Sequence, residues 1–124
     1  QLTKYNNTYD YVKSLGYYEF MTTSHLRGTT FDNCIIVLDE SQNGDFDELS
    51  TVITRVGTNS KVVVIGDSKQ NDLARHREVS GFDKLKTVFD HMPSGMIARI
   101  TYTTDDIVRS GIVKAFLIAA DKVD

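Results

Sequence analysis

Two hydrophobic patterns alternate along this chain. One is a short run of consecutive apolar residues, which is typical of a strand buried on both faces in a parallel sheet. The other places apolar residues three or four positions apart, which is typical of an amphipathic helix. The expected strands are residues 17–21, 34–39, 61–65 and 98–102, and the expected helices are residues 8–15, 45–56, 80–89 and 104–119. This alternation predicts βαβ units, and therefore a parallel sheet wrapped by helices.

Polar residues that cap helices stand where several of these helices should begin. Asp45 and Glu48 have the spacing of a capping box, and Ser80 precedes Asp83 by three residues. Thr104 is followed by two acids and is expected to open the last helix, because acids in a first turn suit the helix dipole. The inner face of that helix is expected to consist of Val108, Ile112, Phe116 and Ala119.

The apolar run from Ile35 to Leu38 leads straight into two carboxylates, Asp39 and Glu40. Open α/β sheets bind ligands at the carboxyl ends of their strands. In a nucleotide hydrolase, one acid at such an end holds Mg²⁺ and a second can polarise the attacking water. The alternative is that both acids simply end the strand in solvent, but the apolar run before them favours a functional site.

A second polar end follows the second apolar run. Gly66 allows a sharp turn, and Asp67 and Gln70 should then lie at the same edge of the sheet as Asp39. A glutamine there can orient a water molecule or contact a γ-phosphate without adding charge. Taken alone this is an ordinary Gly-Asp turn; two polar strand ends on one edge favour a site.

Two arginines are candidates for contacting phosphate. Arg109 is expected in the first turns of the last helix, and Arg27 lies in a polar loop. A guanidinium in either place can stabilise phosphate charge. A solvated arginine without a ligand explains both residues equally well.

Composition limits the classes of function. The 124 residues suffice for one domain, and the net charge of −3 does not indicate an overall basic surface for nucleic acid. The single cysteine, Cys34, excludes an internal disulfide, and the three dispersed histidines do not favour a zinc site. No apolar run approaches the roughly 18–20 residues of a membrane span. Because the chain begins at Gln1 without a methionine, we expect a processed chain or a fragment.

The phosphate-binding loop that is expected beside an acidic nucleotide site is missing from this sequence. A phosphate-binding loop needs glycines followed by Lys-Ser or Lys-Thr, and none of the eight glycines precedes a lysine. The pattern therefore predicts the metal- and water-handling half of a nucleoside triphosphatase site without its phosphate cradle.

A series of short motifs occurs in a fixed order along the chain: Arg27–Phe31, Ile36–Asn43, Thr54–Gly57, Ser60–Asp67, Gln70, Asp72-Leu73, Ser80–Phe82 and Asp106–Arg109. Together these motifs resemble the PhoH-like family, the phosphate-starvation-inducible ATP-binding proteins of bacteria and phages, which are related to superfamily 1 helicases. The resemblance covers roughly residues 17–117 and implies a RecA-like P-loop ATPase fold.

The resemblance also implies roles for individual residues. Asp39 and Glu40 match the Walker B pair, for Mg²⁺ and the catalytic water respectively. Gln70 matches a γ-phosphate sensor, and Asp67 belongs to the same motif. Arg109 matches a phosphate-contacting arginine, and Arg27 belongs to a further family motif.

The sequence departs from the family in three places. Ser41 stands where the family usually has alanine, and Ser110-Gly111 replaces a usual His-Pro, which puts the reach of Arg109 in question. The Walker A loop, which lies upstream in the family, is missing.

The resulting expectation is an α/β fold, a RecA-like parallel sheet that lacks the Walker A strand and loop. Residues 1–16 would be an N-terminal helical extension and residues 17–124 the C-terminal part of the ATPase domain. The resemblance implies ATP hydrolysis with Mg²⁺ in the intact protein, coupled to RNA unwinding or processing, in a cytoplasmic homo-oligomer without a membrane. The open strand edges predict that this chain dimerises or rearranges.

Two other interpretations stay open. The chain could be a non-catalytic ATPase-like module used for assembly or nucleic-acid docking. A flavodoxin-like α/β domain with an acidic pocket would suit Asp39 and Asp67 but leaves Gln70 and Arg109 unexplained.

Overall fold

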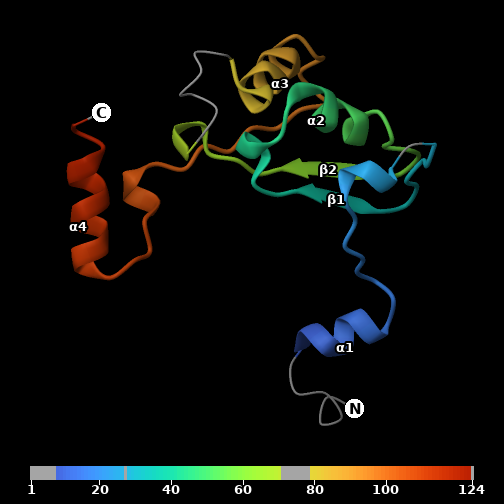
Figure 1. Ribbon diagram of the computed structural model, residues 1–124, viewed down its shortest axis with the longest axis horizontal. Coiled ribbons are helices and arrows are strands. Elements are labelled where there is room, and N and C mark those ends of the chain that lie inside the picture. Colours follow the sequence, from blue (N-terminus) through green and yellow to red (C-terminus); the bar gives the residue numbers. More distant parts are fainter. Residues whose placement is uncertain (1–7, 27, 71–78, 124) are drawn as a thin grey trace. The chain divides into compact units, whose positions relative to one another are not determined.

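The computed structural model describes residues 8–26, 28–70 and 79–123 (Figure 1). The chain divides into two compact units, Gln1–His91 and Met92–Asp124. The helices and strands of the described residues are α1 (Thr8–Ser14), β1 (Ile35–Leu38), α2 (Phe46–Ile53), β2 (Lys61–Val64), α3 (Gly81–Asp90) and α4 (Gly111–Ala120). The expected division at residue 17 stays a prediction.

The first unit is built on one βαβ motif. β1 and β2 are parallel, with Ile35 beside Lys61 and Leu38 beside Val64, and α2 connects them. The prediction of an α/β fold with parallel strands is confirmed. The sheet has two strands among the described residues.

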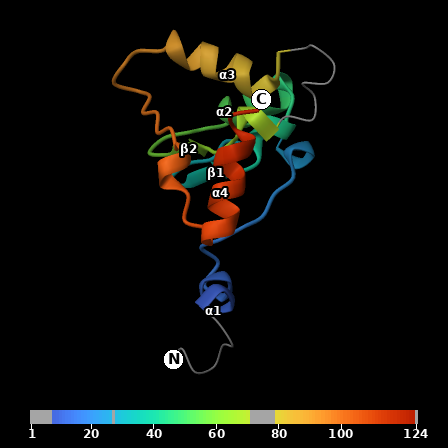
Figure 2. The ribbon, with the colours of Figure 1, turned by 90° about the vertical axis from the view of Figure 1, so that its left-hand side faces the viewer.

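The hydrophobic core of this unit lies on one side of the sheet. Figures 1 and 2 both show α2 and α3 on the same side of β1 and β2. Leu49 and Val52 of α2 and Leu85 of α3 are buried. These residues recur at helical spacing, as expected for the apolar faces of the two helices.

The other face of the sheet is exposed, so the expectation of strands buried on both faces is wrong. Ile35 and Val37 expose 69% and 58% of their surface, whereas Ile36 and Leu38 are half-buried. β2 shows the same alternation. Side chains of a strand point alternately to opposite faces, and α2 and α3 cover only one of them.

The capping box of α2 is confirmed. The Asp45 carboxylate accepts from the Glu48 N–H at 2.8 Å, and the Asp45 N–H donates to the Glu48 carboxylate at 3.4 Å. The helix ends at Ile53, before the expected residue 56. It stops because the next residues pair elsewhere: the Phe31 N–H donates to the Arg55 carbonyl at 2.8 Å, and Phe31 forms a parallel bridge with Val56.

Two expected strands are absent. Residues 17–21 and 98–102 have no strand structure, and no strand of the described residues pairs with either. In the first segment, Tyr18 instead makes edge-to-face contacts with Tyr9 of α1 and with Phe20. In the second, Ile100 is 79% exposed. An apolar run without a partner strand cannot satisfy its backbone as a strand does.

The expected last helix is two elements. A 3₁₀ turn, η6 (Thr104–Asp106), begins with a capping box between Thr103 and Asp106, and the backbone is extended at Ile107. α4 begins only at Gly111. The predicted inner face is not buried, since Ile112 is 81% exposed and Phe116 is exposed too.

The longest described helices, α3 and α4, have ten residues each, and none in the described part of the chain is long and apolar enough to cross a membrane.

Candidate functional site

The carboxyl ends of β1 and β2 meet, as the sequence predicts for parallel strands. The Ile65 N–H donates to the Leu38 carbonyl at 2.8 Å, and the Ser41 N–H donates to the Ile65 carbonyl at 2.9 Å. Asp39 follows β1 directly, Asp67 lies three residues after the last residue of β2, and both are exposed. Their expected position at one edge of the sheet is therefore confirmed, while their chemical roles stay predictions.

Glu40 has an unusual backbone conformation. Its φ of 52° and ψ of 37° lie in the left-handed region, which few residues other than glycine adopt without cost. Its N–H donates to the Asp39 carboxylate at 2.9 Å. Glu40 is exposed.

Gln42 joins the two strand ends through its side chain. It lies in the 3₁₀ turn η3 (Ser41–Asn43) and is only 3% exposed. Its Nε2 donates to the Glu40 carboxylate at 2.6 Å, and its Oε1 accepts from the Asp67 N–H at 3.1 Å. Sequence reasoning gave Gln42 no role, because nothing in the pattern distinguishes it from an exposed turn amide such as the neighbouring Asn43.

The turn after β2 is fixed by close packing. The space where a side chain at Gly66 would begin lies 2.9 Å from the Phe82 ring of α3, so glycine lets the turn approach that helix. The Lys69 N–H donates to the Asp67 carboxylate at 2.9 Å, which stabilises the following 3₁₀ turn, η4 (Ser68–Gln70).

A polar cluster also attaches η4 to α3. The Asp83 carboxylate accepts from the hydroxyls of Ser68 and Ser80, both at 2.8 Å, and pairs with the Lys86 ammonium at 2.6 Å. The hydrogen bond from Lys86 lowers the pKa of Asp83 below its ordinary value; the two hydroxyls lower it further, and partial burial opposes them. We call these four residues the Asp83 clamp.

The remaining predicted site residues are Gln70, Arg27 and Arg109. Gln70 is the last residue of η4. Arg27 lies outside the described residues. Arg109 is exposed and lies between η6 and α4 in the second unit, so its expected place in the first turns of a helix is wrong. η6 ends at Asp106 and the backbone is extended at Ile107, so the helical conformation stops before Arg109.

The carboxylates fit a metal ion held largely by other ligands. Within the described residues, no three His, Cys, Asp or Glu side chains gather as a complete metal site. Mg²⁺ needs only one or two carboxylates when phosphate and water complete its shell. Asp39 suits that role, since only one of its side-chain oxygens accepts a hydrogen bond within the described part of the chain. The chain has no Gly-Lys sequence to cradle the phosphates themselves.

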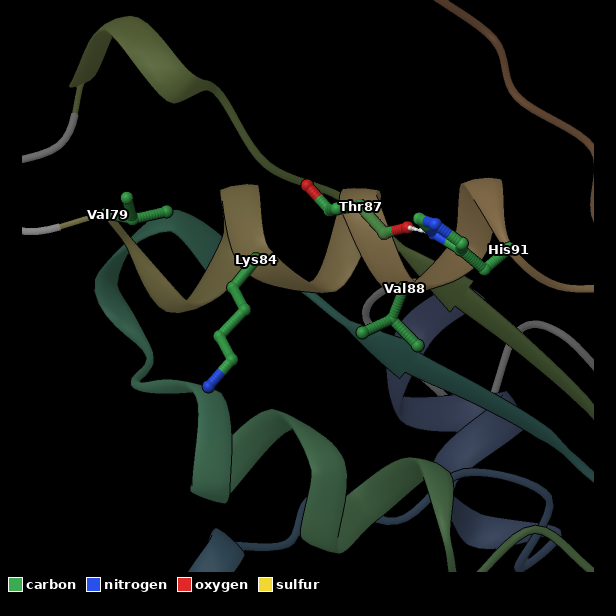
Figure 3. A pocket seen from close by; sticks show the side chains of 5 residues that line it. All are labelled: Val79, Lys84, Thr87, Val88 and His91. Carbon is green, nitrogen blue, oxygen red and sulfur yellow. Dashed lines mark hydrogen bonds between the residues drawn. The ribbon is translucent and has the colours of Figure 1, made fainter.

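A pocket of about 550 Å³ lies along α3, away from these residues (Figure 3). Lys84 points from it toward α2, where its ammonium lies 4.2 Å from the centre of the Phe46 ring. The His91 Nδ1 donates to the Thr87 carbonyl at 2.8 Å. The lining residues are Val79, Lys84, Thr87, Val88 and His91, none of which is a predicted site residue.

Comparison with known proteins gives consistent matches. The family described as PhoH-like protein matches residues 2–121. The chain is 32% identical over 105 residues to Protein PhoH of Escherichia coli, which covers 85% of this chain and 29% of that protein. It is 33% identical over 106 residues to a PhoH-like protein of Mycobacterium leprae, covering 86% and 30%, and 31% identical over 109 residues to one of Bacillus subtilis, covering 86% and 33%. The chain thus spans about a third of the length of these relatives.

Proposed function

The chain belongs to the PhoH-like family of P-loop nucleoside triphosphatases, and from this premise we propose that it supplies the metal- and water-handling part of an ATP-hydrolysing site. The observation that carries the proposal is the meeting of the two strand ends, where the Gln42 amide bridges Glu40 and the Asp67 backbone. In α/β proteins this edge is the usual place for a ligand.

Each residue at the edge has a chemical role in this proposal. Asp39 binds Mg²⁺, which neutralises phosphate charge when bound. Glu40 accepts a proton from the attacking water as general base. Gln70 contacts the γ-phosphate, and Asp67 holds the turn that carries Gln70. Arg109 and Arg27 contact phosphate oxygens, within this subunit or from a neighbouring one.

The proposal for the intact protein reaches further. There the strands form part of a RecA-like sheet, completed by a Walker A strand and loop that this sequence does not contain. ATP hydrolysis would be coupled to RNA unwinding or processing by a cytoplasmic homo-oligomer. The family membership and the parallel βαβ unit support the nucleotide-binding sheet in this proposal.

The decisive variant is Glu40→Gln in the protein expressed from its full gene. Removal of a general base typically costs 10²–10⁴-fold in rate, so hydrolysis should fall by at least about 100-fold. ATP affinity should stay within about threefold, because the substitution keeps the size of the side chain and leaves Asp39 in place. Phosphate release and fluorescent-ATP titration measure the two quantities. A parallel loss of ATP binding would mean that Glu40 is structural.

The 124-residue chain by itself should hydrolyse ATP negligibly. Most affinity for a triphosphate comes from a backbone cradle and its lysine, which this sequence lacks. Turnover by the isolated chain that Glu40→Gln abolishes would contradict this expectation.

A second candidate function is a non-catalytic ATPase-like module for assembly or nucleic-acid docking. Absence of ATP hydrolysis by the protein from its full gene, together with retained oligomerisation or RNA binding, would support the module instead.

A further inference from the structure

Gln42 differs from the proposed site residues at the strand ends because it is buried. Its side chain is 3% exposed, while Asp39, Glu40 and Asp67 are exposed. Both ends of its amide are used: Nε2 donates to Glu40 at 2.6 Å, and Oε1 accepts from the Asp67 N–H at 3.1 Å. One buried group therefore contacts both halves of the proposed site.

The amide has one orientation that satisfies both contacts. A rotation by half a turn would place its NH₂ against the Asp67 N–H and its oxygen against the Glu40 carboxylate, which are two repulsive pairs. A buried polar atom without a partner is costly, so the amide resists losing either contact. Gln42 therefore links the two sides. If Glu40 moves, the turn after β2 resists the movement, and if that turn moves, Glu40 resists it.

We infer that Gln42 is a positioning residue that couples the Glu40 carboxylate to the Gly66–Gln70 turn; this rests on the proposed function. Gln42 touches neither ATP nor water in this role. It holds the orientation of the general base and makes that orientation depend on the turn that carries Gln70. A ligand that moves the turn would thus also realign the base.

Two variants separate the two contacts. Gln42→Glu keeps an acceptor for the Asp67 N–H but places a second carboxylate against Glu40, so it breaks only the Glu40 contact. Gln42→Met has a similar length and breaks both contacts without adding charge. The matched control is Ser41→Ala, which removes another buried side-chain hydrogen bond of the same turn, donated to the Leu38 carbonyl at 3.0 Å.

In the protein from its full gene, both Gln42 variants should lower kcat about 10–100-fold, the range that a misplaced catalytic group causes. The KM for ATP should change less than about threefold, because Gln42 is not a ligand of the nucleotide. Ser41→Ala should leave kcat unchanged. Equal losses in Ser41→Ala and Gln42→Met would reduce Gln42 to an ordinary structural residue and overturn the inference, as would an unchanged kcat in the folded Gln42 variants.

The coupling can also be measured without touching the buried amide or relying on catalysis. Glu40→Ala in the 124-residue chain removes an exposed side chain, so folding should be preserved. It should nevertheless shift the ¹H–¹⁵N resonance of the Asp67 amide, because Gln42 loses its acceptor and relaxes. The control is Asp47→Ala, an exposed acid of α2, which should leave that resonance in place. An Asp67 resonance unaffected by Glu40→Ala would overturn the coupling, whereas a protein from the full gene without any ATPase activity would overturn only the proposed function.

Discussion

At the scale of the residue, Asp83 shows how one carboxylate can hold two elements together. It contacts Ser68 of η4 and Lys86 of its own helix, and its backbone N–H donates to the helix-capping hydroxyl of Ser80 at 3.0 Å. Because its pKa is lowered on folding, the unfolded chain binds the proton more readily than the folded chain. The clamp therefore stabilises the fold fully above the ordinary carboxyl pKa of about 4, and this stabilisation is lost as the pH falls through the lower folded value.

This predicts a pH-dependent cost for Asp83→Asn. Near neutral pH the substitution should lower the free energy of unfolding by at most about 1 kcal/mol, since the ion pair is partly exposed and screened by solvent. Below pH ~4 the difference from the original chain should shrink. Urea denaturation at several pH values measures it. Asp47→Asn, which removes an exposed acid outside the clamp, serves as the control, and a cost that is constant with pH would contradict the prediction.

The position of a site residue was predictable where an acidic residue follows the apolar run of a strand. Asp39 and Asp67 follow apolar runs, and their common edge is visible from that pattern. Gln42 was not predictable, because its importance comes from its burial and from a hydrogen-bond partner 25 positions away. Long-range contacts of that kind leave no periodic signal in one sequence.

At the scale of the element, α2 depends on its first turn. The helix has eight residues, and an isolated helix of that length is marginal in water. Its capping box satisfies backbone N–H groups that have no partner within the helix. α2 also carries Leu49 and Val52 into the core and connects β1 to β2, so a frayed α2 would loosen the sheet edge as well.

Asp45→Ala should therefore lower the free energy of unfolding by about 1 kcal/mol, because alanine cannot accept the Glu48 N–H. Asp45→Asn should keep most of this stability, since asparagine caps helices about as well as aspartate. Thermal unfolding followed by circular dichroism compares the three proteins. Equal losses in both variants would show that the charge of Asp45 matters more than its hydrogen bond.

The helices and strands that the sequence predicted correctly are those whose signals lie within a few neighbouring residues. The capping box and the helical spacing of Leu49 and Val52 identified α2 from sequence, and apolar runs identified β1 and β2. Residues 98–102 have the same kind of run but form no strand, because pairing depends on a neighbour that the run itself cannot supply. The start of the last helix was misjudged because Thr104 and its acids suit a 3₁₀ turn as well as an α-helix.

At the scale of the whole molecule, the open face of the sheet is the main unpartnered surface of the first unit. Ile35, Val37, Val63 and Ile65 are exposed there. Two parallel strands are rarely stable with one apolar face in water, because parallel sheets are normally covered on both faces. Strand edges without partners add a template for pairing with another chain.

We expect the 124-residue chain to self-associate through this face. Light scattering at tens of micromolar should give a mass above that of a monomer. Replacing Val37 and Val63 together by lysine should shift the mass toward the monomer, because the charges resist burial in an interface. Val79→Lys is the matched control, since Val79 is exposed but lies outside the sheet, and it should leave the association intact. A monomeric original chain would contradict the expectation.

The left-handed backbone at Glu40 has a consequence for how this chain can evolve. A glutamate costs free energy in that conformation, and glycine would occupy it without strain. Selection for stability alone would therefore push position 40 toward glycine, while selection for a carboxylate at the strand end would oppose it. Among naturally occurring variants of this chain, glycine at this position would mark copies that had given up the carboxylate, and with it the proposed water activation, while keeping the fold.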